Sequence, residues 1–340
     1  MSRAKPVISF FDVHTSDQEY YRTALEPDYK LKFTDAALSS ETIESARDAQ
    51  VISVHVSSHV TAVLMRLVPD LHHIACRTTG YDNVDMAYAK THNISVSTVP
   101  AYGEDTVAEY AFLLLLAVSR RLMRAAHSVH AGHSNPEKLT GNDLHSKTLG
   151  IVGTGRIGRS AARIGRGFGM NVLAYDPFPN NAASTEIGYE YVKLDQLLKA
   201  ADYITLHAPS TPETHHMLDS RAFSKMKSGV FIVNTARGNL IDTAALIEAL
   251  TSGKVGGAGL DVLEGEEHLE FAAEVQLLNE TTIDDQAKSL LSIDILTKMP
   301  NVLITAHNAY NSAEALGRIR QKTIENILSW ESGSARNLVA

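Results

Sequence analysis

The chain has 340 residues, which is more than one hydrophobic core usually serves and predicts two domains. Its 31 lysine and arginine residues against 39 aspartate and glutamate residues give a formal net charge of -8, with no basic run, which argues against nucleic acid and anionic membranes as partners. The single cysteine, Cys76, cannot form an internal disulfide and the first residues lack the apolar core of a secretory signal, so the cytosol is the expected compartment.

Short apolar runs alternate with helix-like stretches through the first hundred residues. The candidate strands are VISFFDV, LKFT, VISVHV, HHIACRT and ISVST, at residues 7–13, 31–34, 51–56, 72–78 and 94–98. Helix-like stretches lie between them, among them residues 59–67 and 84–92. This alternation predicts a parallel sheet with helices on both faces.

Residues 101–132 carry acidic side chains near their start and arginines towards their end, which predicts one long helix. The apolar run at residues 112–118 is far shorter than the roughly 20 residues that span a bilayer. The helix holds too many large apolar residues for one exposed face, so we expect a second domain or a partner subunit to cover it. A homodimer with this helix in the interface is the prediction.

A second series of strand-like runs begins after Ser146. Its members are TLGIVGTG, NVLAYD, YITLHAP, GVFIVNTA, VGGAGLDV and NVLITAH, at residues 148–155, 171–176, 203–209, 229–236, 255–262 and 301–307. The sequence therefore predicts two doubly wound parallel-sheet units of the α/β class.

The first run of this second series ends in three glycines, Gly153, Gly155 and Gly158. A strand, this turn and a helix beginning near Arg156 match the dinucleotide-binding fingerprint. In it, the first glycine makes the turn, the second admits a pyrophosphate and the third lets the helix pack on the strand. The helix N-terminus offers N–H groups to the phosphates. A glycine-rich turn without a ligand is the alternative.

The next predicted strand ends on Asp176. An acidic residue there can accept hydrogen bonds from both ribose hydroxyls of adenosine and repels a 2′-phosphate. Neither Pro177 nor Phe178 is basic, so the sequence favours NAD over NADP. The alternative for Asp176 is a turn residue before a proline.

Hydride transfer to a 2-oxo acid needs a cation for the substrate carboxylate, a proton donor, and a group that keeps the donor charged. Arg237, Asp261, Glu266 and His307 all follow predicted strands, where ligands bind in open α/β sheets. An arginine can hold a carboxylate through two hydrogen bonds. Separately, each residue has a plainer interpretation: a surface arginine, a solvated acidic loop or a structural histidine.

The histidine-rich stretches do not predict a metal site. His127, His130 and His133 drift around a helix at their spacing, and the adjacent pairs at residues 72–73 and 215–216 have no carboxylate or cysteine in a zinc-like pattern.

The motifs GTGRIG, YDPFP, VNTARG, GLDVLEGEE and AHNA resemble the D-isomer-specific 2-hydroxyacid dehydrogenases, over nearly the whole chain. The D-lactate dehydrogenase branch looks most similar, because RTTGYDNVD, VPAY and TARGNLID occur in that wording and a long segment separates Glu266 from His307. The sequence departs from that branch at His55, where an aromatic residue is frequent, and at Thr214, where asparagine is frequent.

The resemblance implies a role for each matching position. Arg237 would clamp the substrate, His307 would be the acid/base, and Glu266 would keep its imidazole protonated for reduction. NAD would contact Gly153, Gly155, Arg156, Ile157, Gly158, Asp176, His207, Ala208, Thr214, Thr235, Ala236 and Asp261, the last near the nicotinamide. Thr79 and Gly80 would donate backbone hydrogen bonds to the substrate, and Tyr102 and Tyr310 would line its site.

The implied architecture is a Rossmann NAD-binding domain at residues 103–302, inserted into a flavodoxin-like substrate domain at residues 1–102 and 303–340. The implied activity is NAD-dependent interconversion of pyruvate and D-lactate. A dehydrogenase for a larger 2-oxo acid, such as 2-oxoisocaproate or phenylpyruvate, is one alternative. An NAD-sensing, corepressor-like binding protein is the other, because fold alone does not establish catalysis.

Overall fold

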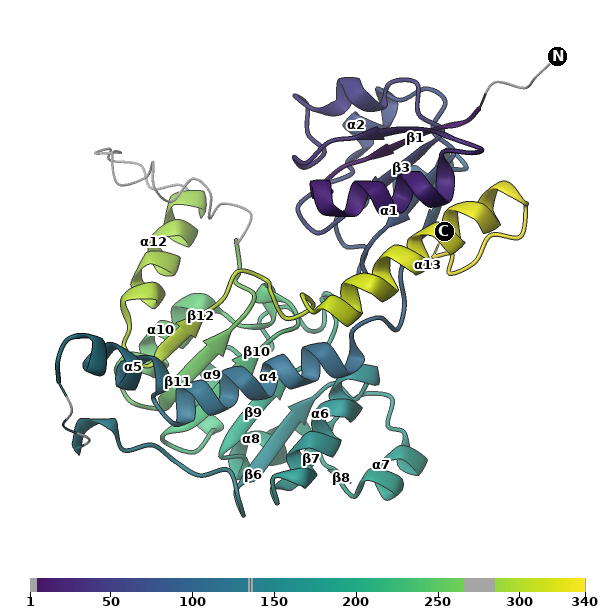
Figure 1. Cartoon of the computed structure of the whole chain (residues 1–340). Helices are drawn as coiled ribbons and strands as arrows, with labels where there is room; N and C mark the ends of the chain where they lie inside the picture. Colours follow the sequence, from purple (N-terminus) through teal and green to yellow (C-terminus); the bar gives the residue numbers. More distant parts are fainter. Residues whose placement is uncertain (1–4, 134, 136, 266–284, 340) are drawn as a thin grey trace. The chain divides into compact units, whose positions relative to one another are not determined.

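The computed structural model describes residues 5–133, 135, 137–265 and 285–339 (Figure 1). The chain forms two compact units, one from Met1–Tyr102 with Ser312–Ala340 and the other from Gly103–Asn311. We call them the terminal unit and the central unit. Each is an α/β fold built on its own parallel sheet.

The terminal unit has a five-stranded sheet in the order β2-β1-β3-β4-β5, with parallel pairing throughout. Its strands are β1 (Val7–Phe10), β2 (Lys30–Phe33), β3 (Val51–Val54), β4 (His73–Cys76) and β5 (Ser95–Ser97). Its helices are α1 (Thr15–Leu25), η1 (Ile43–Ala46), α2 (Ala62–Arg66), α3 (Met86–Thr91) and α13 (Ala313–Glu331). The first series of predicted strands is therefore confirmed.

Both faces of this sheet are buried, because successive side chains of a strand point to opposite faces. In β3, Val51 packs in one cluster with Tyr21 of α1 and Ile327 of α13. Its neighbour Ile52 packs in a second cluster with Leu64 of α2. Burial of both faces explains why these strands are continuous apolar runs in the sequence.

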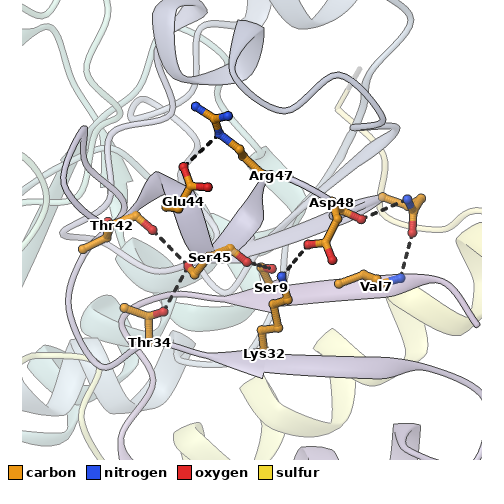
Figure 2. A network of polar contacts seen from close by, with 10 residues as sticks. Val7, Ser9, Lys32, Thr34, Thr42, Glu44, Ser45, Arg47 and Asp48 are labelled. Carbon is orange, nitrogen blue, oxygen red and sulfur yellow. Dashed lines mark hydrogen bonds and ion pairs between the residues drawn. The ribbon is translucent and has the colours of Figure 1, made fainter.

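Figure 2 shows a network of polar contacts around β1, β2 and η1 of the terminal unit. Ser9 Oγ donates to the Ser45 carbonyl oxygen at 2.9 Å, and Ser45 Oγ donates to the Thr42 carbonyl oxygen at 3.0 Å. Lys32 Nζ pairs with the carboxylate of Asp48. These contacts hold the segment between β2 and β3 against β1.

The central unit has a seven-stranded sheet in the order β12-β11-β10-β9-β6-β7-β8, also parallel throughout. Its strands are β6 (Thr148–Val152), β7 (Asn171–Tyr175), β8 (Glu190–Tyr191), β9 (Tyr203–Leu206), β10 (Val230–Asn234), β11 (Val255–Leu260) and β12 (Val302–Ile304). The second series of predicted strands is confirmed. The short edge strand β8 is an addition, since two residues are too few for a recognisable pattern.

Helices cover both faces of the central sheet (Figure 1). The helices described in the central unit are α4 (Glu104–Ser119), α5 (Leu122–His130), α6 (Arg156–Gly167), α7 (Asn181–Ile187), α8 (Leu194–Ala200), α9 (Ser220–Lys225), α10 (Thr243–Thr251) and α12 (Asp285–Lys298), with the short turns η2 (Glu137–Leu139) and η3 (Gly238–Leu240). Phe112 of α4 and Ala161 of α6 share a core cluster with Ile151 of β6. Leu197 of α8 and Leu246 of α10 share another with Ile232 of β10.

The prediction of one long helix over residues 101–132 is wrong. The chain forms α4 and α5, and Arg121 between them has a left-handed backbone with φ 53. The later segment at residues 141–142 packs against the end of α4, where Asn142 N donates to the Ser119 carbonyl oxygen at 2.9 Å. This bond caps a carbonyl of the last turn, which a helix end leaves without an intrahelical partner.

The C-terminal edge of the central unit lies beyond the expected domain boundary at residues 302–303. Strand β12 spans that boundary and pairs with β11, with Leu303 opposite Gly259. The central unit therefore continues to Asn311. Backbone pairing holds this segment in the central sheet.

Candidate active site

The predicted site residues of the central unit follow the carboxyl ends of neighbouring parallel strands. In the order of the sheet from its edge strand β12 inwards, they come after β12 (His307), β11 (Asp261), β10 (Thr235, Ala236 and Arg237), β9 (His207, Ala208 and Thr214), β6 (Gly153, Gly155 and Gly158) and β7 (Asp176). Because all strands are parallel, these ends lie along one side of the sheet. The order along the chain reverses between β6 and β9, which is where doubly wound sheets bind ligands.

The glycine-rich turn lies at this reversal point, and two of its glycines are required by close backbone approach. Gly153 has φ +90, and a Cβ on it would lie 2.7 Å from the Ala208 nitrogen. A Cβ on Gly158 would lie 2.0 Å from the Gly153 carbonyl oxygen. A Cβ on Gly155 would meet no atom within 4 Å, so this glycine borders open space at the start of α6.

The first residues of α6 offer backbone rather than side-chain contacts to an anion. The Arg156 side chain points to Glu104, with Nε 3.7 Å from Oε1. The Ile157 side chain is partly buried against the cluster that includes Ile151. Their N–H groups begin a helix of 12 residues, whose dipole favours negative charge at this end.

Asp176 directly follows β7 and is held by neighbouring donors. Its Oδ2 accepts hydrogen bonds from Thr154 N at 2.7 Å and from Thr154 Oγ1 at 2.9 Å. Its Oδ1 accepts one from Phe178 N at 2.8 Å. Asp176 accepts a hydrogen bond from the backbone of a following residue, Phe178, as a turn residue does. The two bonds from Thr154 connect it to the glycine-rich turn as well.

The loop after β9 contains His207, Ala208 and Thr214. His207 N donates to the Val152 carbonyl oxygen at 2.7 Å, and burial lowers the pKa of its imidazole to about 4, so the side chain is neutral at pH 7. Thr214 Oγ1 donates to the Pro209 carbonyl oxygen at 2.7 Å. The Thr214 hydroxyl thus closes its own loop.

The loop after β10 holds an unsatisfied hydroxyl next to the predicted substrate clamp. Thr235 Oγ1 is buried and has no hydrogen-bond partner in the described part of the chain, which indicates a place where a ligand supplies the partner. Asn234 shapes the loop, since its Oδ1 accepts from Ala236 N at 3.0 Å and its Nδ2 donates to the Arg237 carbonyl oxygen at 2.8 Å. Arg237 itself is half-buried.

His307 follows β12 in a left-handed conformation with φ 47, which is costly for a residue with a side chain. Asp261 at the end of β11 holds this loop. Its Oδ1 accepts from Thr305 Oγ1 at 2.5 Å and Asn308 N at 2.8 Å, and its Oδ2 accepts from Ala309 N at 2.8 Å. The His307 N–H donates to the Asp261 carbonyl oxygen at 2.9 Å.

Asp261 therefore holds the His307 loop in place, and it is 1% exposed. The family resemblance assigns Asp261 to the nicotinamide and does not predict this contact. No sequence signal announces it, because Asp261 and the loop are far apart in the chain and meet only where β11 pairs with β12.

Glu266 lies outside the described residues. The preceding acidic residue, Glu264, is described and its Oε1 lies 2.7 Å from His216 Nε2. This pair joins the loop after β9 to the loop after β11, and it is absent from the sequence analysis.

The atoms of His215, His216 and Glu264 that could ligate a metal lie within 4.8 Å of one another. The two imidazole rings stack with centroids 3.9 Å apart and planes at 29°. The structure thus brings a carboxylate to the histidine pair at residues 215–216, which the spacing in the sequence does not indicate.

The remaining predicted substrate residues lie apart in the sequence. Thr79 and Gly80 follow β4 in the terminal unit, where Thr79 Oγ1 donates to the Val99 carbonyl oxygen at 2.9 Å and the Gly80 carbonyl oxygen accepts from Thr78 Oγ1. The Tyr102 carbonyl oxygen accepts from Arg318 Nε at 2.6 Å. Tyr310, in the central unit, lies edge-on to His307 with ring centroids 6.5 Å apart.

Comparison with known proteins identifies this arrangement. Residues 112–309 match the family model described as D-isomer specific 2-hydroxyacid dehydrogenase, NAD binding domain. The chain belongs to this family. D-lactate dehydrogenase from Escherichia coli (strain K12) is 36% identical over 332 residues, which are 96% of this chain and 97% of that protein.

Solved structures of the family superpose on nearly the whole chain. D-lactate dehydrogenase from Aquifex aeolicus, complexed with NAD and lactic acid, has a TM-score of 0.87 and 37% identity and covers 98% of each chain. D-2-hydroxyisocaproate dehydrogenase has a TM-score of 0.81 and 29% identity over 98% of this chain and 99% of that one. The protein is thus an NAD-dependent oxidoreductase with a Rossmann NAD-binding domain, as the sequence analysis predicts.

The residues of the central unit fit NAD. The space at Gly155 lies at a helix N-terminus, a carboxylate follows the neighbouring strand, and the buried hydroxyl of Thr235 has no partner among the described residues. None of the helices that the structure describes has the length and apolar character needed to cross a membrane.

Proposed function

We propose that this dehydrogenase interconverts pyruvate and D-lactate, with NAD as the cofactor. The relatives named D-lactate dehydrogenase support this choice, since they match over nearly the whole chain. The observation that carries the proposal is the His307 loop, where a strained left-handed backbone is held by four hydrogen bonds to Asp261. Strain of this kind persists only where the surroundings enforce it.

Each residue has a separate task in the proposed reaction. Arg237 binds the substrate carboxylate through its planar guanidinium, which orients the carbonyl carbon. His307 donates a proton to the carbonyl oxygen during reduction and removes it during oxidation, so reduction needs the imidazolium and oxidation the neutral ring. Glu266 stabilises the imidazolium. Bound NADH supplies the hydride.

We assign the cofactor to the central unit. Backbone groups at Gly155, Arg156 and Ile157 contact the pyrophosphate, Asp176 the ribose, and the loops at residues 207–214 and 235–236 the rest of the cofactor. For the substrate, we assign Thr79, Gly80 and Tyr102 in the terminal unit and, separately, Tyr310 in the central unit. The assignment of the NAD-binding role is supported by the family model, which covers residues 112–309.

A larger 2-oxo acid is the second candidate, supported by the similarity to D-2-hydroxyisocaproate dehydrogenase. His55 distinguishes this chain from the frequent aromatic residue of the D-lactate branch. It is half-buried, its N–H donates to Asp12 Oδ2 at 3.2 Å, and its carbonyl oxygen accepts from Asn83 Nδ2 at 3.1 Å.

The test is NADH oxidation, followed by absorbance, with pyruvate, 2-oxobutyrate, 2-oxoisocaproate and phenylpyruvate. We expect the highest kcat/KM with pyruvate, a D-configured product, and a loss of about 10² to 10⁴ in rate for His307→Gln. A higher kcat/KM with 2-oxoisocaproate or phenylpyruvate would replace D-lactate by the larger substrate. No turnover with any of them would favour the NAD-sensing alternative.

A further inference from the structure

Three adjacent strands of the central unit bring Thr154, Asp176 and Tyr191 together. In the register of the sheet, Val152 of β6 lies opposite Tyr175 of β7, and Ala174 of β7 lies opposite Tyr191 of β8. Thr154 and Asp176, just beyond the paired residues of β6 and β7, therefore meet Tyr191 at the carboxyl ends of the strands. The edge strand β8, which sequence patterns do not reveal, supplies the third side chain.

These three side chains are joined by a continuous series of hydrogen bonds, which we call the relay. Thr154 Oγ1 lies 2.9 Å from Asp176 Oδ2 and 2.7 Å from Tyr191 Oη. Tyr191 Oη also lies 3.0 Å from Asn180 N and 3.1 Å from Tyr189 Oη. Thr154 is 5% exposed, so water competes little for its bonds.

The chemistry of these groups determines which one donates and which one accepts in each hydrogen bond of the relay. An ionised carboxylate can only accept hydrogen bonds, so the Thr154 hydroxyl is the donor in its bond to Asp176. Thr154 Oγ1 must then accept from the Tyr191 hydroxyl, which leaves the Tyr191 oxygen to accept from Asn180 N–H and from the Tyr189 hydroxyl. Burial, and next the hydrogen bond with Tyr191, raise the pKa of Tyr189, so this residue keeps the proton that it donates.

We propose that Thr154 and Tyr191 are positioning residues for cofactor choice, which hold the Asp176 carboxylate towards the adenosine ribose of NAD. This inference rests on the proposed role of Asp176. Two donors from Thr154 hold Oδ2 and one from Phe178 N holds Oδ1. A carboxylate has about four acceptor sites, so the remaining capacity lies on Oδ1.

The relay also explains how a 2′-phosphate is rejected. A carboxylate that could swing aside would let the phosphate approach, but rotation of Asp176 would break both bonds from Thr154 in a nearly buried place. Leaving buried donors without an acceptor is costly. The negative charge therefore stays where the phosphate would have to lie, and this repulsion discriminates between the two cofactors.

The experiment measures dissociation constants of NADH and NADPH by fluorescence titration, without substrate, for four variants. Thr154→Val keeps the shape of the side chain but removes the hydroxyl, Thr154→Ser restores it, and Tyr191→Phe removes the donor to Thr154. Tyr189→Phe is the matched control, because its hydroxyl contacts Tyr191 but neither Thr154 nor Asp176 in the described structure. Thermal unfolding is followed in parallel.

We expect Thr154→Val to reduce the preference for NADH over NADPH by about tenfold, the size of one hydrogen bond to a charged group. Tyr191→Phe should reduce it by roughly threefold, because Thr154 can still donate. Thr154→Ser should restore the preference and Tyr189→Phe should leave it within about twofold. A residue that only supports the fold would lower the melting temperature and weaken both cofactors equally.

A double-mutant cycle with Asp176→Ala separates this inference from the role on which it rests. We expect Thr154→Val to have little effect on the preference once Asp176 is alanine, because the relay then has no carboxylate to hold. If Asp176→Ala lowers the preference while Thr154→Val and Tyr191→Phe do not, the relay is wrong and Asp176 keeps its role. If Asp176→Ala also leaves the preference unchanged, the role of Asp176 fails with it.

Discussion

At the scale of single residues, Asp261 places a buried anion beneath the loop that carries His307. Its two carboxylate oxygens accept from one hydroxyl and two backbone N–H groups of that loop. Three donors compensate the cost of burying the charge, and in return the carboxylate fixes the backbone on both sides of the histidine. The proposed acid/base is thus positioned by the neighbouring strand end.

Asp261→Asn should impair catalysis more than cofactor binding. Asparagine has only one acceptor oxygen, so its NH₂ group would face an N–H or O–H donor of the loop. Two donors that face each other repel, and the loop would shift. We expect kcat to fall by about 10²-fold through displacement of His307, with the dissociation constant of NADH changed much less. Asp202→Asn is the control, because Asp202 also accepts a backbone bond, from Thr148 N, but at the amino ends of β6 and β9, the opposite ends of the strands from the His307 loop. An unchanged kcat in Asp261→Asn would contradict this role.

Glu266 gives a second prediction at this scale, about pH. Reduction needs the imidazolium of His307, and a nearby carboxylate stabilises it. Glu266→Gln keeps the size but removes the charge, so the pH above which reduction declines should move to a lower value. Glu264→Gln is the matched control, since Glu264 is bonded to His216. If Glu264→Gln shifts the pH profile and Glu266→Gln does not, the roles of the two residues are exchanged.

At the scale of elements, α4 and α5 carry apolar side chains that the central unit leaves exposed. They are Leu113 of α4 and Leu122, Met123 and Val129 of α5, the last 69% exposed. None of the α5 residues is buried, although the helix is strongly amphipathic. Exposed apolar side chains are typical of interaction surfaces, and the homodimer predicted from the sequence would bury these.

We therefore expect the protein to sediment as a dimer at micromolar concentration and the double variant Met123→Glu with Val129→Glu to sediment as a monomer. Charges on this surface would be desolvated without partners in the dimer. Val63→Glu is the control, because Val63 is equally exposed but lies on α2 of the terminal unit. A wild-type monomer, or a dimer that persists in the double variant, would exclude this interface.

At the scale of the whole molecule, His73 of the terminal unit and His207 of the central unit both have a pKa that burial lowers. His73 in the terminal unit bonds Ser95 Oγ at 2.8 Å and Ser97 Oγ at 2.9 Å, and burial lowers its pKa to about 4. In the central unit, burial alone lowers the pKa of His207 to about 4. The unfolded chain takes up these protons near pH 6.5, whereas the folded chain does not.

Stability should therefore fall as the pH drops from about 6.5 to about 4. The contribution of each histidine is fully present above its unfolded pKa and is lost as the pH approaches its folded pKa, by on the order of 3 kcal/mol. Denaturant unfolding at a series of pH values measures the slope. His73→Gln should flatten it, and the exposed neighbour His72→Gln should not. The same slope in His73→Gln and wild type would assign the acid sensitivity to other groups.

The sequence by itself determined the two sheets, their strands apart from β8, and the identity of the cofactor. Strands buried on both faces are continuous apolar runs, and the glycines and Asp176 follow strands at a fixed local spacing, so short stretches of chain contain this information. The cofactor and the family were predicted for the same reason.

Only the tertiary structure decided how the strand ends support one another. The order of the parallel strands brings Asp261 under the His307 loop, Glu264 to His216 and Tyr191 to Thr154, and none of these pairs is close in sequence. The same holds for the break after α4, which depends on residues 141–142 packing back on its last turn. Local patterns record which residues follow a strand, whereas their partners are set by the pairing of strands that lie far apart in the chain.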